Sequence, residues 1–564
     1  MNQTKRTMTG LLLWLGWTAA ISSAAFVPAG AEQLLQGAKH VQTRTFKETK
    51  PLASGGLLRV EGMQGDITIT GWDRNEVAVE AVVEAGDADA AFIKEFLDNT
   101  ALTLENNKSG LVLKLESPLS WKQDRQSRLD KQSELFKRFK SRKWNLSYAA
   151  KVNILVPSSL ALEADNSFGD IVVRGVSGRL GLRNESGSVR LDSCGGTLDL
   201  NNSFGPVRVA GFAGAVVIGN ESGRVELENI GGAADVRNSF QDVVFKKIDG
   251  PLTVVSESAS VTGTGVAGDC RIRSSFKKID VGDVRGRCEI NGESAEVAVD
   301  LVDRDAVLAN SFRPLRAVRI KGSLRVTSES SPVNAADIGG EAVIQTSFND
   351  ILVERVRGRV VVTGESSGVT LKQIDGDATI VSSFKKIEVA TIGGKLDIRA
   401  ESASVAAVDI KKDAVIVTSF SDIEARRIGG GLKAEGESTA VLGEDIGGPV
   451  EIRNSFKNVI LRKTSGSISI VGESSGVDVS QIRSLPSGSV IDIKTSFKPI
   501  VLALPAGTAV KGTARTEFGR IDTALPVYLL DGGSVGRQSV RFGAGTEGVT
   551  LKLKNSSDIR IKNP

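Results

Sequence analysis

Apolar residues recur along this chain every 18 residues. With Phe168 as position zero of the repeat, positions three, five, eight, twelve and fourteen are mostly aliphatic, and eighteen successive units carry Val, Ile or Leu at position three. Apolar residues two apart are typical of β-strands with one buried face. Because the unit keeps its length from residue 166 to residue 491, it predicts a solenoid whose units stack one on another.

The fold class predicted by this pattern is all-β, a single-stranded parallel β-helix (β-solenoid) with 18-residue rungs. The irregular sequence before it predicts a small α/β N-terminal cap, with a helix over 89–98 and a pair of strands over 102–115. Eighteen rungs spaced ~4.8 Å apart would extend about 86 Å. The expected organisation is a signal peptide at 1–31, a leader at 32–54, the cap and first rungs at 55–165, the regular solenoid at 166–491, and irregular last rungs with a C-terminal cap at 492–564.

Two dipeptides alternate at the start of the units. Ser-Phe recurs every 36 residues from Phe168 to Phe456, and Glu-Ser falls midway from Glu185 to Glu473. We interpret the alternation of Phe and Ser as a packing solution in one corner of the rung. The Glu series is interpreted as polar residues that solvate a turn. Neither interpretation assigns a ligand.

Two further columns of residues indicate turns. Position ten is usually Gly, which favours a tight corner with an unusual backbone angle. The position two residues before zero begins with a run of Asn, which predicts a ladder of stacked side-chain amides. The ladder would contain Asn166, Asn184, Asn202, Asn220 and Asn238.

The N-terminus has the pattern of a secretory signal. Lys5 and Arg6 precede an apolar run over 11–20, and Ala29-Gly30-Ala31 has the small residues of a cleavage site. We therefore expect export, and a location in the periplasm, outside the cell or on its surface. No other segment is long and apolar enough to span a bilayer as a helix, so no transmembrane segment is expected after cleavage.

One segment carries most of the positive charge. The formal net charge is +4, whereas residues 122–143 alone hold nine Lys or Arg against three acids. A basic amphipathic helix with aromatic ends is typical of binding to an anionic membrane surface or an acidic polymer. The alternative, which we favour, is a helix that covers the open end of the solenoid and keeps a solvated basic face. The candidate envelope- or anion-binding residues are Trp121, Lys122, Arg125, Arg128, Lys131, Lys137, Arg138, Lys140, Arg142, Lys143 and Trp144.

The sequence gives little support to catalytic chemistry. His40 is the only histidine, which removes His-based acid–base catalysis and His metal sites, and no cofactor is expected. Acidic residues follow columns through many units and do not gather at one place, as an active site would require. Cys270 and Cys288 lie one unit apart at inward positions, and we interpret them as buried core thiols, with a disulfide as the alternative.

Three stretches carry a resemblance to a known family. They are the opening segment 60–73 (VEGMQGDITITGWD) with 76–79, the segment 152–157 followed by NSFGDI at 166–171, and the ending NSSDIRI at 555–561. These stretches resemble a bacterial adhesin-type β-strand-repeat family whose domain has no assigned function. The resemblance spans nearly all of the chain after the signal, and it implies a β-solenoid and an adhesin-like role. The basic insertion departs from the family pattern.

These observations lead to a hypothesis of function. We expect a non-enzymatic secreted or periplasmic β-solenoid that acts as an adhesin-like or scaffold protein of the cell envelope. The expected partners are an envelope glycan, an anionic membrane surface or another protein, and nucleic acid is not expected. The alternative is a carbohydrate-active β-helix enzyme, either a polysaccharide lyase or a glycosidase, because one fold can carry unrelated activities. The oligomeric state is left open.

Overall fold

The computed structural model describes residues 38–118, 137, 139, 141, 146–531, 537–543 and 547–562. The chain forms two compact units. The first unit comprises Met1–Arg44, Val82–Thr100 and Ser117–Ala150, and the second comprises Thr45–Ala81, Ala101–Glu116 and Lys151–Pro564. The predicted signal peptide lies outside the described residues.

The first unit is built around one short helix, α2 (Ala90–Asp98). Asp89 caps this helix, because its carboxylate accepts hydrogen bonds from the backbone N–H groups of Ala91 and Phe92. The helix expected over 89–98 is thus confirmed. Its buried face carries Phe92 and Phe96. Parts of β1 (His40–Pro51), β4 (Glu76–Asp87) and β7 (Ser147–Pro157) also belong to this unit.

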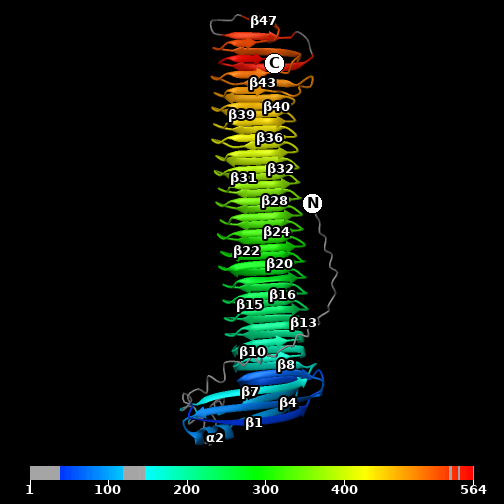
Figure 1. The fold of residues 1–564 in the computed structure, drawn as a ribbon, viewed down its shortest axis with the longest axis vertical. Coiled ribbons are helices and arrows are strands. Elements are labelled where there is room, and N and C mark those ends of the chain that lie inside the picture. Colours follow the sequence, from blue (N-terminus) through cyan, green and yellow to red (C-terminus); the bar gives the residue numbers. More distant parts are fainter. Residues whose placement is uncertain are drawn as a thin grey trace, which may run out of the picture. The chain divides into compact units, whose positions relative to one another are not determined.

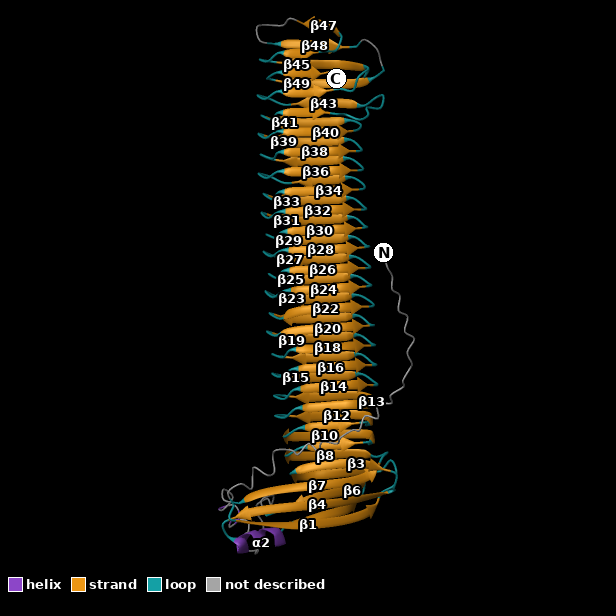
Figure 2. Ribbon diagram, in the orientation of Figure 1, coloured by secondary structure: helices purple, strands orange, loops and turns teal. Residues whose placement is uncertain are grey.

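The second unit is the predicted parallel β-solenoid, with about 18 turns and rungs of about 18 residues. Each rung contributes one strand to each of two parallel sheets, and the register advances by one rung from strand to strand. In the first sheet Val189 lies opposite Val207, and in the second sheet Leu180 lies opposite Leu198. Figure 1 shows these rungs stacked in chain order, from cyan to orange, and Figure 2 shows loops along both edges of the stack.

The first sheet of the regular stack contains β9 (Ile171–Arg174), β11 (Val189–Asp192), the start of β13 (Val207–Asn220), β14 (Val225–Ile230), β16 (Val243–Ile248), β18 (Val261–Val266), β20 (Lys278–Val284), β22 (Glu296–Val302), β24 (Leu315–Ile320), β26 (Val333–Ile338), β28 (Ile351–Val356), β30 (Val369–Ile374), β32 (Ile387–Ile392), β34 (Val405–Ile410), β36 (Ile423–Ile428), β38 (Val441–Ile446), β40 (Val459–Thr464) and β42 (Val477–Ser480).

The second sheet contains β8 (Ala161–Phe168), β10 (Ser177–Ser186), β12 (Gly195–Asn202), the end of β13, β15 (Ala234–Asn238), β17 (Leu252–Ser256), β19 (Cys270–Ser275), β21 (Cys288–Glu293), β23 (Ala306–Asn310), β25 (Leu324–Ser328), β27 (Ala342–Thr346), β29 (Val360–Gly364), β31 (Ala378–Ser383), β33 (Leu396–Glu401), β35 (Ala414–Val417), β37 (Leu432–Gly436), β39 (Val450–Ser455) and β41 (Ile468–Glu473).

The space between the two sheets is aliphatic. Residues at positions three, five, eight, twelve and fourteen point inward, and in the rung that begins at Ser186 the residues Val189, Leu191, Leu198 and Leu200 are at most 2% exposed. Cys270 lies opposite Cys288 in adjacent strands, and both are buried free thiols. A hydrogen bond with Cys288, together with burial, raises the pKa of Cys270 well above its usual value. The core-thiol interpretation is confirmed.

Most glycines of the position-ten column do not have the unusual backbone angle that the sequence predicted. In the regular rungs, position ten has a positive φ only at Gly178, Gly196, Gly214 and Gly466. Further along, glycine is needed for close approach between rungs, because a Cβ on Gly232 would lie 2.5 Å from the carbonyl carbon of Gly214. The regular left-handed position is seven, with φ between 52° and 81° in eighteen rungs: Gly175, Ser193, Gly211, Asn229, Lys247, Gly265, Asp283, Leu301, Arg319, Asp337, Arg355, Gln373, Thr391, Asp409, Arg427, Asp445, Lys463 and Gln481.

The predicted amide ladder is present but interrupted. Asn166 donates a hydrogen bond from Nδ2 to Oδ1 of Asn184, and Asn202, Asn220 and Asn238 are linked in the same way at 3.1 and 3.3 Å. All five side chains are buried. Among the described contacts, the link between Asn184 and Asn202 is missing, since Asn184 Nδ2 and Asn202 Oδ1 have no partner.

Packing inside the turn that leads from the second sheet to the first explains why the chain repeats every 36 residues and not every 18. In later Ser rungs the residue after Ser points inward and is fully buried, as Ser367 does. The residue two before Ser is then small, because a Cβ on Gly364 would lie 2.7 Å from Cβ of Ser367. In the next Phe rung, Ser382 fills the corner and donates a hydrogen bond of 2.7 Å to the carbonyl of Ser367. Two corner designs therefore alternate.

Both ends of the second unit are closed by strands that insert out of chain order. At the start, β2 (Leu57–Gln64) lies between β8 and β6 (Gly110–Glu116), while β3 (Asp66–Trp72) lies between β9 and β7. β6 also pairs with β5 (Ala101–Asn107) as an antiparallel hairpin, which confirms the pair of strands expected over 102–115.

At the other end, the last two strands form the inserted rung. β49 (Val549–Asn555) pairs with β43 (Val490–Lys494) on one side and β45 (Val510–Thr516) on the other. β50 (Ile559–Lys562) lies in the same way between β44 (Ile500–Ala503) and β46 (Ile521–Thr523). The antiparallel strands β47 (Val527–Asp531) and β48 (Gln538–Phe542) pair next to β45.

Candidate binding edge

The phenylalanines of the Ser-Phe repeat lie on the surface of the solenoid. The interpretation of this column as a packing solution is wrong, because the nine rings are between 52% and 65% exposed. They occupy the turn that leads from the second sheet to the first. We call this column the Phe edge, and it consists of Phe168, Phe204, Phe240, Phe276, Phe312, Phe348, Phe384, Phe420 and Phe456.

The backbone of the Phe edge is strained over much of its length. From Phe276 to Phe456 the six phenylalanines have φ between 59° and 68°. A left-handed conformation at a residue other than glycine costs of order 1 kcal/mol, and a bulky side chain is rare there. Exposed rings return little hydrophobic stabilisation to the fold. Folding alone would therefore favour Gly or Asn at these positions.

A column of glutamates alternates with the rings on the same edge. All nine are exposed, and within the described part of the chain none forms an ion pair or a side-chain hydrogen bond. Successive members are two rungs apart, which is roughly 9.6 Å along the stack. The members of this Glu column are Glu185, Glu221, Glu257, Glu293, Glu329, Glu365, Glu401, Glu437 and Glu473.

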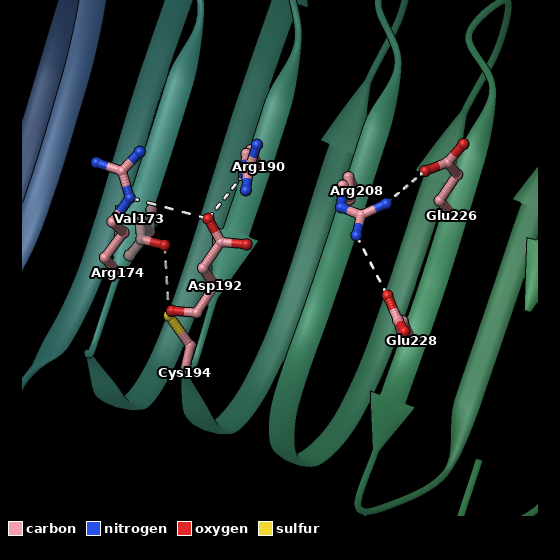
Figure 3. Close-up of polar contacts among 8 residues, drawn as sticks. All are labelled: Val173, Arg174, Arg190, Asp192, Cys194, Arg208, Glu226 and Glu228. Carbon is pink, nitrogen blue, oxygen red and sulfur yellow. Dashed lines mark hydrogen bonds and ion pairs between the residues drawn. The ribbon is translucent and has the colours of Figure 1, made fainter. Parts of the chain in front are cut away.

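Charged residues on the outer face of the first sheet behave differently, as Figure 3 shows. Arg190 contacts Asp192 at 2.7 Å within one strand, and Arg208 reaches Glu226 at 2.8 Å and Glu228 at 3.2 Å on the next rung. These ion pairs satisfy each charge within the solenoid. The glutamates of the edge have no such partners and remain available to a ligand.

Lysines beside the rings are used internally. Lys277, Lys385 and Lys498 each donate a hydrogen bond from Nζ to a Phe carbonyl of an earlier rung, at 3.2, 2.8 and 2.7 Å. Lys385 also contacts Asp350 at 3.3 Å. These bonds link rungs along the edge and hold the turns that present the rings.

An open groove of about 920 Å³ runs beside the first part of the Phe edge. It crosses seven rungs, from Asp165 to Phe276, and lies over the ladder of buried amides. One wall contains the serines that precede each ring, such as Ser203, and the glutamates of the intervening rungs. The charged side chains that line it are Asp165, Arg183, Glu185, Glu221, Arg237, Glu257 and Arg273.

The groove charges are exposed, and no ion pair joins them in the described structure. Three guanidinium groups face four carboxylates, so neither sign dominates. Asn201 adds an amide to the same wall. The groove thus offers donors and acceptors along its length without the strong field that a polyanion or polycation site would have.

Lys137 is the one candidate residue of the basic segment that belongs to the described residues. Trp121, Lys122, Arg125, Arg128, Lys131, Arg138, Lys140, Arg142, Lys143 and Trp144 lie outside the described residues. Lys137 is helical and exposed. Phe139, two residues further on, is fully buried, with its ring centroid 4.9 Å from that of Phe92 and 5.8 Å from that of Phe96.

The same aromatic cluster includes Tyr148, whose ring lies 5.5 Å from that of Phe96. Burial raises the pKa of Tyr148 to about 12. Phe139 is thus packed against the buried aromatic face of α2. Among the described residues, no other candidate residue of the basic segment lies next to Lys137.

The residues of the Phe edge were recognisable in the sequence, but their exposure was not. The position of the rings relative to the strands was ambiguous, because a turn interrupts the alternation of inward and outward residues. The polar residues that directly follow the rings were the available signal. Lys277, Lys385 and Lys457 are long and charged, and they mark this part of the rung as solvated.

No other kind of site emerges from the described residues. They contain no group of three or more His, Cys, Asp or Glu side chains placed to hold a metal ion. In the same residues, no helix has the length and apolar character needed to cross a membrane.

Neither the protein-family models nor the curated proteins contain a match to this chain. The repeat architecture, a β-solenoid, therefore rests on the structure, and the adhesin-type family resemblance remains a prediction.

Proposed function

We propose that this chain is an exported, non-enzymatic binding or scaffold protein with an adhesin-like role at the cell envelope. The Phe edge is its contact surface. In this proposal, the signal at 1–31 directs export, and the solenoid presents one binding motif many times along a single line. The partner is an envelope component, for which a glycan, a membrane surface or another protein are the candidates.

The observation that carries the proposal is the persistence of exposed phenylalanine. All nine Ser-Phe rungs keep the ring, although it is exposed and its backbone is left-handed in six of them. A neighbouring outward column varies, since the position three residues before the ring reads Asp165, Asn201, Arg237 and Arg273 in successive Phe rungs. Contact with a binding partner would explain why an exposed and strained phenylalanine is kept at a position where it does not stabilise the fold.

A carbohydrate-active enzyme is the second candidate, because charged residues do converge in the groove. Glycoside hydrolysis needs two carboxyl groups about 5–9.5 Å apart, one of them in a desolvated site that keeps it protonated. Glu185, Glu221 and Glu257 are exposed and roughly 9.6 Å apart along the stack. Their exposure favours binding over hydrolysis.

The test compares the wild-type protein with a variant in which Phe348, Phe384 and Phe420 are replaced by Ser. We expect the wild type to bind isolated bacterial envelope fragments and the variant to bind at least several-fold more weakly. The same samples are assayed for new reducing ends and for unsaturated sugar products. Equal binding by the two proteins would refute the role of the edge, and release of sugar products would favour the enzyme.

A further inference from the structure

We propose that the groove from Asp165 to Phe276 binds a neutral, linear polysaccharide of extended β-1,4-linked pyranoses. This inference rests on the proposed binding function and names the ligand class for one part of the edge. The groove is long, open and follows the solenoid axis across seven rungs, or roughly 29 Å. Such a shape suits a chain molecule that passes through it, and does not enclose a small ligand.

The lining has the chemistry that hydroxyl groups require. Carboxylates accept hydrogen bonds from sugar hydroxyls, guanidinium groups donate to them, and amides do both. Glu221 and Arg237 come from adjacent rungs, and neither has an internal partner among the described contacts. Because these groups are not already satisfied by the protein, they retain their full capacity to bind a polyhydroxylated ligand.

The balance of charge selects the kind of polymer. Three arginines and four acids line the groove, so a strongly acidic or basic chain would meet as much repulsion as attraction. A neutral chain meets none. The polar lining also disfavours a lipid surface, which would need a continuous apolar area.

The period of the edge matches such a chain. Glutamates and rings each recur every two rungs, about 9.6 Å, which is close to the length of two pyranoses in an extended β-1,4-linked chain. Consecutive sugars in that chain are turned over, so equivalent groups recur every two residues. The exposed ring of Phe276, which lines the groove, can stack on the apolar face of a sugar.

The test is a calorimetric titration of the full protein with cellohexaose and with N-acetylated chitohexaose. Maltohexaose, whose α-1,4 linkages curve the chain, serves as the ligand control. We expect at least one β-1,4 hexamer to bind and maltohexaose to bind more weakly. Glu221→Gln and Arg237→Ala should each weaken the binding about tenfold, as loss of a charged hydrogen bond does.

Glu105→Gln is the matched protein control, since Glu105 is an exposed glutamate of β5 that belongs neither to the Glu column nor to the groove. This variant should bind like the wild type. Failure of both β-1,4 hexamers to bind, equal loss in the control variant, or binding only of heparin or polylysine would overturn the inference. If the hexamers fail while envelope binding still depends on the Phe edge, the proposed function stands and only this ligand class is wrong.

Discussion

Phenylalanines of the Phe edge adopt a strained backbone conformation, and their exposed rings contribute little to the stability of the fold. Phe348 has φ of 67° and is 56% exposed, whereas Ile344, a few residues earlier, is fully buried between the sheets. Exposure and backbone strain together separate residues that build the solenoid from residues that it displays. The same distinction makes the two kinds of residue respond oppositely to substitution.

Replacing Phe348 with Asn should leave stability unchanged or raise it by up to about 1 kcal/mol, because Asn tolerates a left-handed backbone. Ile344→Ala, by contrast, should destabilise the protein by about 2–5 kcal/mol through loss of buried volume. Urea denaturation followed by circular dichroism measures both changes. A large loss of stability in Phe348→Asn would mean that the ring supports the fold.

Ion pairs at position seven predict a loss of stability in acid. Hydrogen bonds from Arg355 to Asp337, and from Arg427 to Asp409, lower the pKa values of the two carboxyl groups. Groups with a depressed folded pKa stabilise the protein above their unfolded pKa, about 3.9, and this contribution disappears as the pH falls through the folded value.

The thermal midpoint should therefore drop below about pH 4. A variant with both Asp337→Asn and Asp409→Asn should show a smaller drop over the same range, although it is less stable at neutral pH. Scanning calorimetry at several pH values measures the effect. Identical pH profiles for variant and wild type would show that these pairs do not contribute.

At the scale of the element, the alternation of two corner designs sets the 36-residue period. In one rung the side chain of Ser367 fills the corner, so position 364 must be Gly to avoid a clash with it. In the next rung the side chain of Ser382 fills the corner and donates a hydrogen bond to the carbonyl of Ser367. Strand positions were predictable from sequence because aliphatic residues such as Val369 and Leu371 alternate with polar ones. The corners were not, since their side chains are chosen by contacts between rungs that a linear pattern does not reveal.

Gly364→Ala should destabilise the solenoid by about 1–3 kcal/mol, because the new methyl group overlaps Ser367. Adding Ser367→Gly should recover much of the loss. Gly282→Ala is the control, since its Cβ would lie 3.5 Å from the nearest atom and should fit without strain. Denaturation midpoints of the four proteins provide the comparison. No rescue in the double variant would contradict the account of the period.

For the whole molecule, the sequence predicted a solenoid, but not how its ends are closed. Periodicity locates rungs along the chain, whereas the insertion of β49 between β43 and β45 depends on contacts between distant segments. The Phe edge was likewise only partly predictable, because the sequence shows that the rings recur but does not show that they are exposed. The basic segment adds Lys137 and Phe139 to the described structure, and its binding role stays a prediction.

Removing residues 547–564 should uncover the strand edges of β43 and β44. Exposed edges of a parallel sheet favour pairing with other chains. The truncated protein should therefore self-associate at concentrations at which the full chain does not. Analytical ultracentrifugation measures this difference. A truncated protein that sediments like the full chain would show that the inserted rung is not a protective cap.

The most direct test of the central claim replaces all nine rings of the Phe edge with Ser and measures two properties of the same protein. We expect the denaturation midpoint to stay the same or rise, while binding to envelope fragments is lost. The rings would then serve a partner and not the fold. A marked fall in the midpoint together with retained envelope binding would contradict this account.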